Sequence, residues 1–216
     1  LVGAYRVEGF DPSYNPWPMI MGAGFSAAIV EEILFRGVLY RLAEDTFGTW
    51  IAIVISGLVF GLVHLGNDQA TLQGALAIAL EAGILFAVLY AMTRSLWLVM
   101  GLHFAWNVVQ GPVLGIVVSG SSASGSGLVR STLEGPEWLA GGPFGMEASL
   151  VTIVVLVALA AVLLVRLARS GQIVQPTWVR KRRLVARNAA SRVSADGSAA
   201  PLDEPVAPPV PPRRAD

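Results

Sequence analysis

The stretch LVTIVVLVALAAVLLV, residues 150–165, carries no polar side chain except Thr152 and is followed by Arg166 and Arg169. An α-helix rises about 1.5 Å per residue, so about 20 apolar residues cross the hydrocarbon core of a bilayer. The stretch therefore predicts a membrane-spanning helix over residues 150–169 whose surface faces lipid.

The composition of the whole chain indicates the same class of protein. Of its 216 residues, 54% are hydrophobic and 14% are charged, a balance typical of membrane proteins. Four further apolar stretches are candidate spans: residues 19–40, 50–65, 72–92 and 96–118. We therefore predict an all-α fold, a polytopic transmembrane helix bundle. The absence of cysteine excludes disulfides and a cysteine nucleophile.

All candidate spans except the one at residues 150–165 contain side chains that lipid does not tolerate on an exposed helix face. These side chains are Glu31, Glu32, Arg36, His64, Glu81, His103 and Asn107. They predict that the bundle surrounds a polar intramembrane cavity. For Glu81, midway along the third span, we expect a hydrogen bond to a neighbouring helix.

The composition also divides the chain into parts. The first residue is not methionine, which indicates a fragment of a longer protein with an extramembrane N-terminal segment at residues 1–18. Four candidate spans lie within residues 19–118, followed by a Gly/Ser-rich loop at 119–149 and the last span at 150–169. Residues 170–216 are basic and then Pro-rich, a composition that cannot bury a core, so we predict a disordered tail.

The arginines predict how the bundle is oriented. If every span crosses, Arg41, Arg94, Arg166 and the RKRR run at 180–183 all lie on one side. The side with more Lys and Arg is usually cytoplasmic, so we expect a cytoplasmic C-terminal tail and an external start of the first span. A single lysine against fourteen arginines, with heavy use of Ala, Val and Gly, indicates a GC-rich bacterial genome and hence a bacterial cell membrane.

In the first span, IVEEILFRGVLY at residues 29–40 places three charges on an apolar helix. Glu32 and Arg36 are four residues apart, so they face each other and can neutralise one another. Glu31 lies about 100° around the helix and lacks that partner. Two interpretations remain open: Glu31 is a reactive carboxylate, or all three charges form one ion cluster that joins helices.

The two histidines of the chain both lie in spans. Phe60 and His64 are four residues apart on the second span, and His103 and Asn107 are four apart on the fourth. Counted from the arginine ends, Glu31, His64 and His103 lie roughly 15, 20 and 9 Å deep, which predicts one shared cavity toward the cytoplasmic half.

Such a cavity contains the groups needed to hydrolyse an amide. A buried Glu31 can take a proton from water, an imidazole can hold that water, and His103 with Asn107 can donate to an oxyanion. The set Glu31, His64 and His103 could equally bind zinc, although the HExxH pattern of common zinc proteases is absent.

The motifs EExxxR at Glu31, Glu32 and Arg36, FxxxH at Phe60 and His64, and HxxxN at His103 and Asn107 resemble the CPBP (Abi) family. That family contains type II CAAX prenyl endopeptidases and bacteriocin-processing proteins. The resemblance covers residues 19–118 and implies an α-helical intramembrane endopeptidase whose site opens toward the cytosol.

By motif position, the resemblance implies that Glu31 is the water-activating base and that His64 is a partner of water or substrate. It implies an oxyanion hole at His103 and Asn107, with Glu32, Arg36 and Phe60 in support. We favour this glutamate mechanism without a cofactor, with a zinc-dependent mechanism as the alternative. Expected partners are membrane lipid and a protein or peptide substrate, and no nucleic acid.

Prenylated CAAX substrates are not expected in a bacterium, so a leader peptide or another membrane-associated protein is the more plausible substrate. A rival interpretation is a non-enzymatic membrane protein, either a bacteriocin immunity scaffold or a transporter, in which buried polar groups serve ion passage. Glu81 favours this rival because the three motifs do not use it. The repeated halves with broken helices that are typical of transporters are absent from the sequence.

Overall fold

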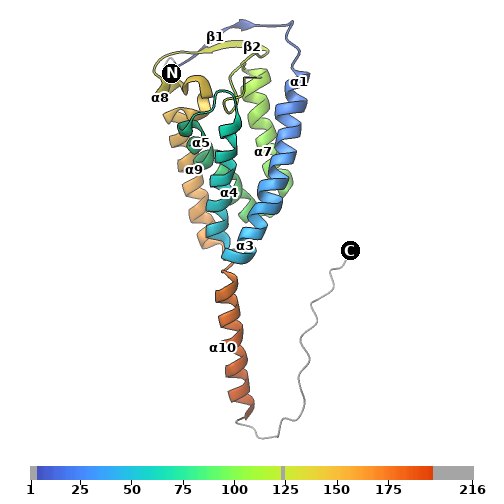
Figure 1. The fold of residues 1–216 in the computed structure, drawn as a ribbon, viewed down its shortest axis with the longest axis vertical. Coiled ribbons are helices and arrows are strands. Elements are labelled where there is room, and N and C mark those ends of the chain that lie inside the picture. Colours follow the sequence, from blue (N-terminus) through green and yellow to red (C-terminus); the bar gives the residue numbers. More distant parts are fainter. Residues whose placement is uncertain (1–3, 123–124, 197–216) are drawn as a thin grey trace. The chain divides into compact units, whose positions relative to one another are not determined.

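The computed structural model describes residues 4–122 and 125–196 of the chain (Figure 1). The chain forms two units, Leu1–Thr177 and Trp178–Asp216. In chain order the elements are β1 (Tyr5–Phe10), α1 (Trp17–Met19), α2 (Ala27–Glu32), α3 (Arg41–Phe47), α4 (Thr49–Val63), α5 (Leu72–Ile78), α6 (Ile84–Thr93), α7 (Leu96–Val108), β2 (Val129–Leu133), α8 (Glu137–Ala140), α9 (Leu150–Arg169) and α10 (Thr177–Asp196).

Several of these helices are joined by π-helical stretches rather than by turns. Ile20–Ser26 and Ile33–Tyr40 connect α1, α2 and α3 into one helix, Trp17–Phe47, while Ala79–Gly83 connects α5 to α6. Val109–Val113 extends α7. A π-helical turn shifts the register of the side chains that follow it and is frequent at functional sites.

Local sequence explains where the helices begin and end. Thr71 and Ser149 are N-cap residues whose hydroxyl groups accept hydrogen bonds from the Gly74 and Thr152 amides at 2.9 and 3.2 Å. Gly48 separates α3 from α4 with a φ of 84°, a left-handed conformation that suits glycine. These signals make α3 and α4 separate helices that pack against each other.

The helical bundle predicted from the sequence is confirmed. Within the described residues, four helices are long and apolar enough to cross a membrane: Trp17–Phe47, Thr49–Gly66, Leu72–Thr93 and Leu150–Arg169. Of the predicted span at residues 96–118, residues 96–113 form a helix, α7 with its π-helical extension, but this helix is not among those four. Its polar side chains, His103 and Asn107, lower its hydropathy and face the interior of the bundle, where both are buried.

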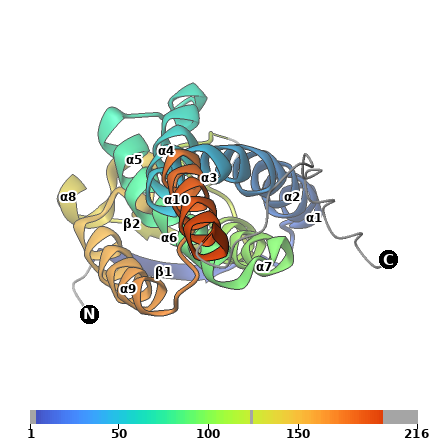
Figure 2. The same cartoon turned by 90° about the horizontal axis from the view of Figure 1, so that it is seen from below.

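The bundle is organised around α6, which packs against α4, α7 and α9 (Figure 2). Leu85, Ala87 and Val88 on α6 are buried in the main hydrophobic cluster. The outermost span is α9, since 11% of its most apolar window is buried. Its Val154 and Val155 are exposed, as expected for side chains that contact lipid.

Small residues let α4 approach the third span closely. A Cβ atom added at Gly61 would lie 2.3 Å from the Ala75 carbonyl oxygen, and one added at Gly83 would lie 2.6 Å from the Gly57 carbonyl oxygen. Close contact between small residues is a common way for membrane helices to associate, because lipid provides little hydrophobic drive for helix association.

We expect Gly61→Ala to destabilise the protein by about 1–3 kcal/mol, because the added methyl group overpacks this contact. Gly101→Ala on α7 is the matched control, since a Cβ there meets nothing within 4 Å and alanine favours a helix by about 1 kcal/mol over glycine. Thermal denaturation in detergent should lower the Tm of Gly61→Ala and leave that of Gly101→Ala equal or higher. Equal Tm values for both variants would contradict the contact.

The bundle of the first unit has two chemically different ends. At one end, here called the arginine end, lie Arg41, Arg94, Arg166 and Arg169. There Arg94 forms an ion pair with Glu44 of α3, and the Gln172 amide donates to the Met92 carbonyl oxygen at 3.3 Å. These contacts join the ends of the first, third and last spans.

The opposite end, here called the loop end, contains the α4–α5 connection at residues 67–71, residues 114–149 and the strand β1 (Figure 1). Strands β1 and β2 form an antiparallel pair in which Tyr5 lies opposite Leu133. The sequence analysis did not predict this sheet. It joins the N-terminal segment to the region predicted as a Gly/Ser-rich loop, which also contains α8.

The second unit contains most of α10, a polar and strongly basic helix. Its formation departs from the prediction of a disordered tail over residues 170–216. Residues 177–196 lack Gly and Pro and are rich in Ala and Arg, which are good helix formers. Residues 197–216, the Pro-rich part of the predicted tail, lie outside the described residues.

Candidate functional site

The Glu32 carboxylate is the centre of a buried polar cluster. Its Oε1 atom accepts a hydrogen bond from Arg36 Nη1 at 2.9 Å and another from His103 Nδ1 at 3.0 Å. The side chains of Glu32 and Arg36 are both fully buried. The predicted pairing of Glu32 with Arg36 is therefore present, and Glu32 has a second contact, to α7, that the sequence did not reveal.

Arg36 extends this cluster to the third span. Its Nη2 atom donates to the carbonyl oxygens of Ala82 and Gly83 at 3.1 and 3.0 Å; these are the last two residues of the π-helical stretch that precedes α6. The guanidinium carbon lies 4.3 Å from the centre of the Phe60 ring, a cation–π geometry. A single arginine thus connects the first three spans.

Phe60 packs between the two histidines. Its ring centre lies 5.0 Å from that of His64 and 5.9 Å from that of His103. His64 Nδ1 lies 2.7 Å from the Phe60 carbonyl oxygen. Because a carbonyl oxygen only accepts, Nδ1 carries a proton, and in the neutral ring Nε2 keeps its lone pair. His64 can therefore accept a hydrogen bond at Nε2.

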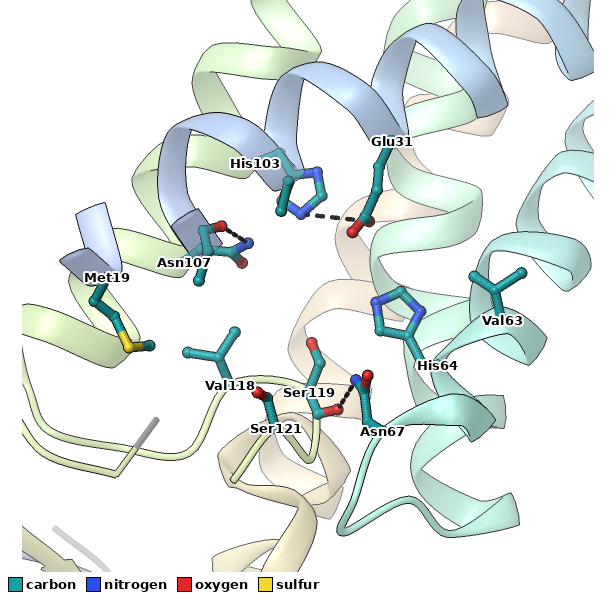
Figure 3. Close-up of a pocket in the computed structure, with 12 residues that line it drawn as sticks. Met19, Glu31, Val63, His64, Asn67, His103, Asn107, Val118, Ser119 and Ser121 are labelled. Atoms are coloured by element: carbon teal, nitrogen blue, oxygen red, sulfur yellow. Dashed lines mark hydrogen bonds and ion pairs between the residues drawn. The ribbon is translucent and has the colours of Figure 1, made fainter. Parts of the chain in front are cut away.

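The predicted site residues line one cavity of about 270 Å³ (Figure 3). Glu31, His64, His103 and Asn107 all contribute to its wall, so helices far apart in the chain meet there. The Glu31 Oε2 atom lies 4.0 Å from His103 Nε2. Among the residues that the structure describes, this buried oxygen has no hydrogen-bond partner. Glu31 is thus a carboxylate with free hydrogen-bonding capacity beside a cavity.

Asn107 lies on the same side of the cavity as His103 (Figure 3). Its Nδ2 atom donates to the Ala23 carbonyl oxygen of the first helix at 2.8 Å. An amide nitrogen carries two hydrogens, so one N–H group remains for a further acceptor. The contact to Ala23 also fixes the orientation of the side chain.

The sequence analysis missed the residues that hold the opposite wall of the cavity. Buried Glu147 accepts hydrogen bonds from Trp106 Nε1 at 2.8 Å and from the Ser119 backbone and hydroxyl groups. Asn67 Nδ2 donates to the Ser119 carbonyl oxygen at 2.6 Å. Burial raises the pKa of the Glu147 carboxyl, and the bonds from Trp106 and Ser119 act against that rise. Glu147 thereby joins the cavity wall formed by residues 118–121 to Trp106 of α7.

For the peptidase activity that the three motifs imply, we expect Glu147→Gln to lower cleavage efficiency about 10- to 100-fold, because Gln presents an NH₂ group toward these donors and the cavity wall shifts. As a positioning residue, Glu147 should affect KM more than kcat. Steady-state kinetics of Glu147→Gln would test this. The control, measured in parallel, is Glu137→Gln, a substitution at an exposed position. A kcat loss at unchanged KM would argue against a positioning role.

Glu81 lies apart from the cavity that Glu31 lines. It is buried and lines a separate cavity of about 110 Å³ together with Glu147 and Trp106. Its Oε1 atom has no hydrogen-bond partner within residues 4–122 and 125–196. The expected hydrogen bond to a neighbouring helix is therefore not made by this oxygen.

The depth estimate predicted that the main cavity lies toward the arginine end. The lining residues instead place it toward the loop end. On the first helix the cavity is lined by Met19, Ala23, Ala27 and Glu31. These residues form one face of the helix, which runs from the middle of the helix to its N-terminus at the loop end. The estimate failed because the first helix continues past Arg41 to Phe47. The arginine end is therefore farther from Glu31 than the sequence suggested.

Glu31, His64 and His103, the ligands that the zinc-dependent alternative would use, do not form a ligand set. Over the described parts of the chain, no group of three His, Cys, Asp or Glu side chains is arranged to hold a metal ion. This arrangement does not support a metalloprotease.

Comparison with known proteins confirms the resemblance deduced from the motifs. Residues 13–109 match the family described as type II CAAX prenyl endopeptidase Rce1-like. The matched region contains all three motifs and ends two residues after Asn107. At family level, this match and the four apolar helices support a membrane peptidase.

A Bacillus subtilis (strain 168) protein named "Putative membrane peptidase YdiL" is 30% identical to the chain over 89 residues. The aligned region is 41% of this chain and 34% of that protein, so the chain spans about a third of the length of this curated relative. No solved structure matches the chain.

Proposed function

We propose that the protein is an intramembrane endopeptidase that hydrolyses a peptide bond with water activated by Glu31. The observation that supports this most is the buried Glu31 Oε2, which has no partner among the described residues and lies 4.0 Å from His103 Nε2 in a polar cavity. A carboxylate in such a site is suited to accept a proton from water.

In the proposed reaction, a water molecule in the cavity is held between Glu31 and the Nε2 lone pair of His64. Glu31 takes one proton, and the resulting hydroxide attacks the carbonyl carbon of the scissile peptide. The carbon–oxygen double bond opens, and its electrons move onto the carbonyl oxygen. A tetrahedral oxyanion forms.

In this proposal, His103 and Asn107 stabilise the oxyanion. Asn107 donates with the N–H group that Ala23 does not use. His103 can donate from Nε2 when both ring nitrogens carry protons, since its Nδ1 atom already donates to Glu32. Fixed donors aimed at developing charge supply a large part of the catalysis of acyl transfer.

The intermediate then collapses, and the carbon–nitrogen bond breaks. The proton held by Glu31 passes to the leaving amine, which regenerates the carboxylate. The products are a new C-terminal carboxylate and a new N-terminal amine, so one water molecule is consumed per bond. The substrate class that fits is a membrane-associated protein or peptide, since the site lies among membrane helices.

Comparison of membrane peptides from cells that express the wild type or Glu31→Gln tests this function. Peptides that accumulate with the wild type and not with the variant identify substrates and cleavage sites. Identical peptide profiles at equal protein levels would contradict the proposed activity.

The mechanism also predicts that cleavage does not need a metal ion. Purified protein in lipid vesicles should retain its activity after dialysis against EDTA and 1,10-phenanthroline, because Glu31 alone activates the water. The control is a known zinc protease treated in parallel. Loss of activity that added zinc restores would instead support the metal-dependent alternative.

A further inference from the structure

The cavity lies toward one end of the bundle. Its lining residues on the first helix lie between Glu31 and Met19, where that helix approaches the loop end. Asn67 of the α4–α5 connection and Ser119 and Ser121 of the long loop complete the wall. These residues place the cavity in the half of the bundle next to the loop end.

The two ends differ strongly in basic charge. The arginine end carries Arg41, Arg94, Arg166 and Arg169, and the RKRR run at 180–183 follows in the chain. Among the described residues of the loop end, the bases are Arg6 and Arg130. Acidic residues accompany them there: Glu8, Asp11, Asp68, Glu134 and Glu137.

In membrane proteins, segments rich in Lys and Arg close to the spans stay on the cytoplasmic side. This rule places the arginine end in the cytoplasm and the loop end outside. The cavity lies next to the loop end, so in that orientation it lies in the extracytoplasmic half of the bundle. The arginine distribution therefore argues against the cytosolic opening that the family resemblance implies.

We propose that the cavity opens on the extracytoplasmic face and that its substrates are membrane-proximal peptide segments exposed outside the cytoplasm. The substrate class rests on the proposed peptidase function, whereas the orientation does not. A secreted peptide still bound to the membrane, or the external juxtamembrane segment of a membrane protein, has the required position.

The chain lacks cysteine, so single cysteines can report the orientation without removal of native thiols. Ser126→Cys places a thiol at the loop end, and Thr46→Cys places one at the arginine end; both positions are exposed. We expect a membrane-impermeant maleimide to label Ser126→Cys in intact bacterial cells, and Thr46→Cys only after permeabilisation. The reverse pattern, or labelling of both variants in intact cells, would overturn the orientation.

A second arm tests the substrate class. One peptide segment cleaved by the wild type is fused beside a single-span anchor, either outside or inside the cell. We expect cleavage of the external fusion alone. Cleavage of the internal fusion alone would overturn the proposal while leaving the peptidase function intact, whereas the labelling result stands even if neither fusion is cleaved.

Discussion

Glu31→Gln is expected to lower kcat by about 10²–10⁴-fold, the usual contribution of a general base. The amide has nearly the same shape as the carboxylate but cannot accept a proton from water at neutral pH. Because Glu31 makes no buried ion pair as close as that between Glu32 and Arg36, the variant should fold normally. Measurement of kcat in reconstituted vesicles, with equal amounts of monodisperse protein, provides the test.

Glu134→Gln is the matched control for this substitution. Glu134 is exposed at the loop end and pairs with Arg6 at 3.0 Å, away from the cavity. Its variant should keep the wild-type kcat. If Glu31→Gln and Glu134→Gln were equally active, Glu31 would not be the base.

Glu32→Leu is expected to destabilise the protein by about 3–5 kcal/mol, because it leaves the Arg36 charge buried without its carboxylate. Both side chains are fully buried in the native protein. Thermal denaturation in detergent should show a large fall in Tm. The exposed pair Arg6–Glu134 is the control, since Glu134→Leu should change stability by less than about 1 kcal/mol.

The double variant Glu32→Leu/Arg36→Met separates the two roles of Glu32. Removal of both charges should recover much of the lost stability, because no uncompensated charge then remains in the bundle. Cleavage should stay low, since His103 has lost its acceptor at Nδ1. A double variant as unstable as Glu32→Leu would show that Arg36 is not the source of the destabilisation.

The sequence predicted the spans well because their apolar stretches are long and their ends are marked by arginines or caps. It did not predict the π-helical stretches, which depend on packing between helices rather than on local propensity. Nor did it predict the β1–β2 pair, because Tyr5 and Leu133 meet only after the bundle has formed. Such long-range pairing leaves a weak local signal.

The motif residues could be predicted because four-residue spacing puts Glu32 with Arg36, and His103 with Asn107, on common helix faces. Their partners on other helices could not. The contact between His103 and Glu32 joins residues 71 positions apart, and Glu147 lies in a loop without a motif. The direction of the cavity also required the structure, since residue counts along single helices did not place the helices relative to one another.

Chemical rescue tests the central claim, that the Glu31 carboxylate activates water, most directly. Glu31→Ala removes the carboxylate and leaves space for a small acid in the cavity. The account predicts almost no cleavage by this variant in buffer, and cleavage that rises with added formate, with no such rise for His103→Ala. Cleavage by Glu31→Ala at the wild-type rate without formate would contradict the claim.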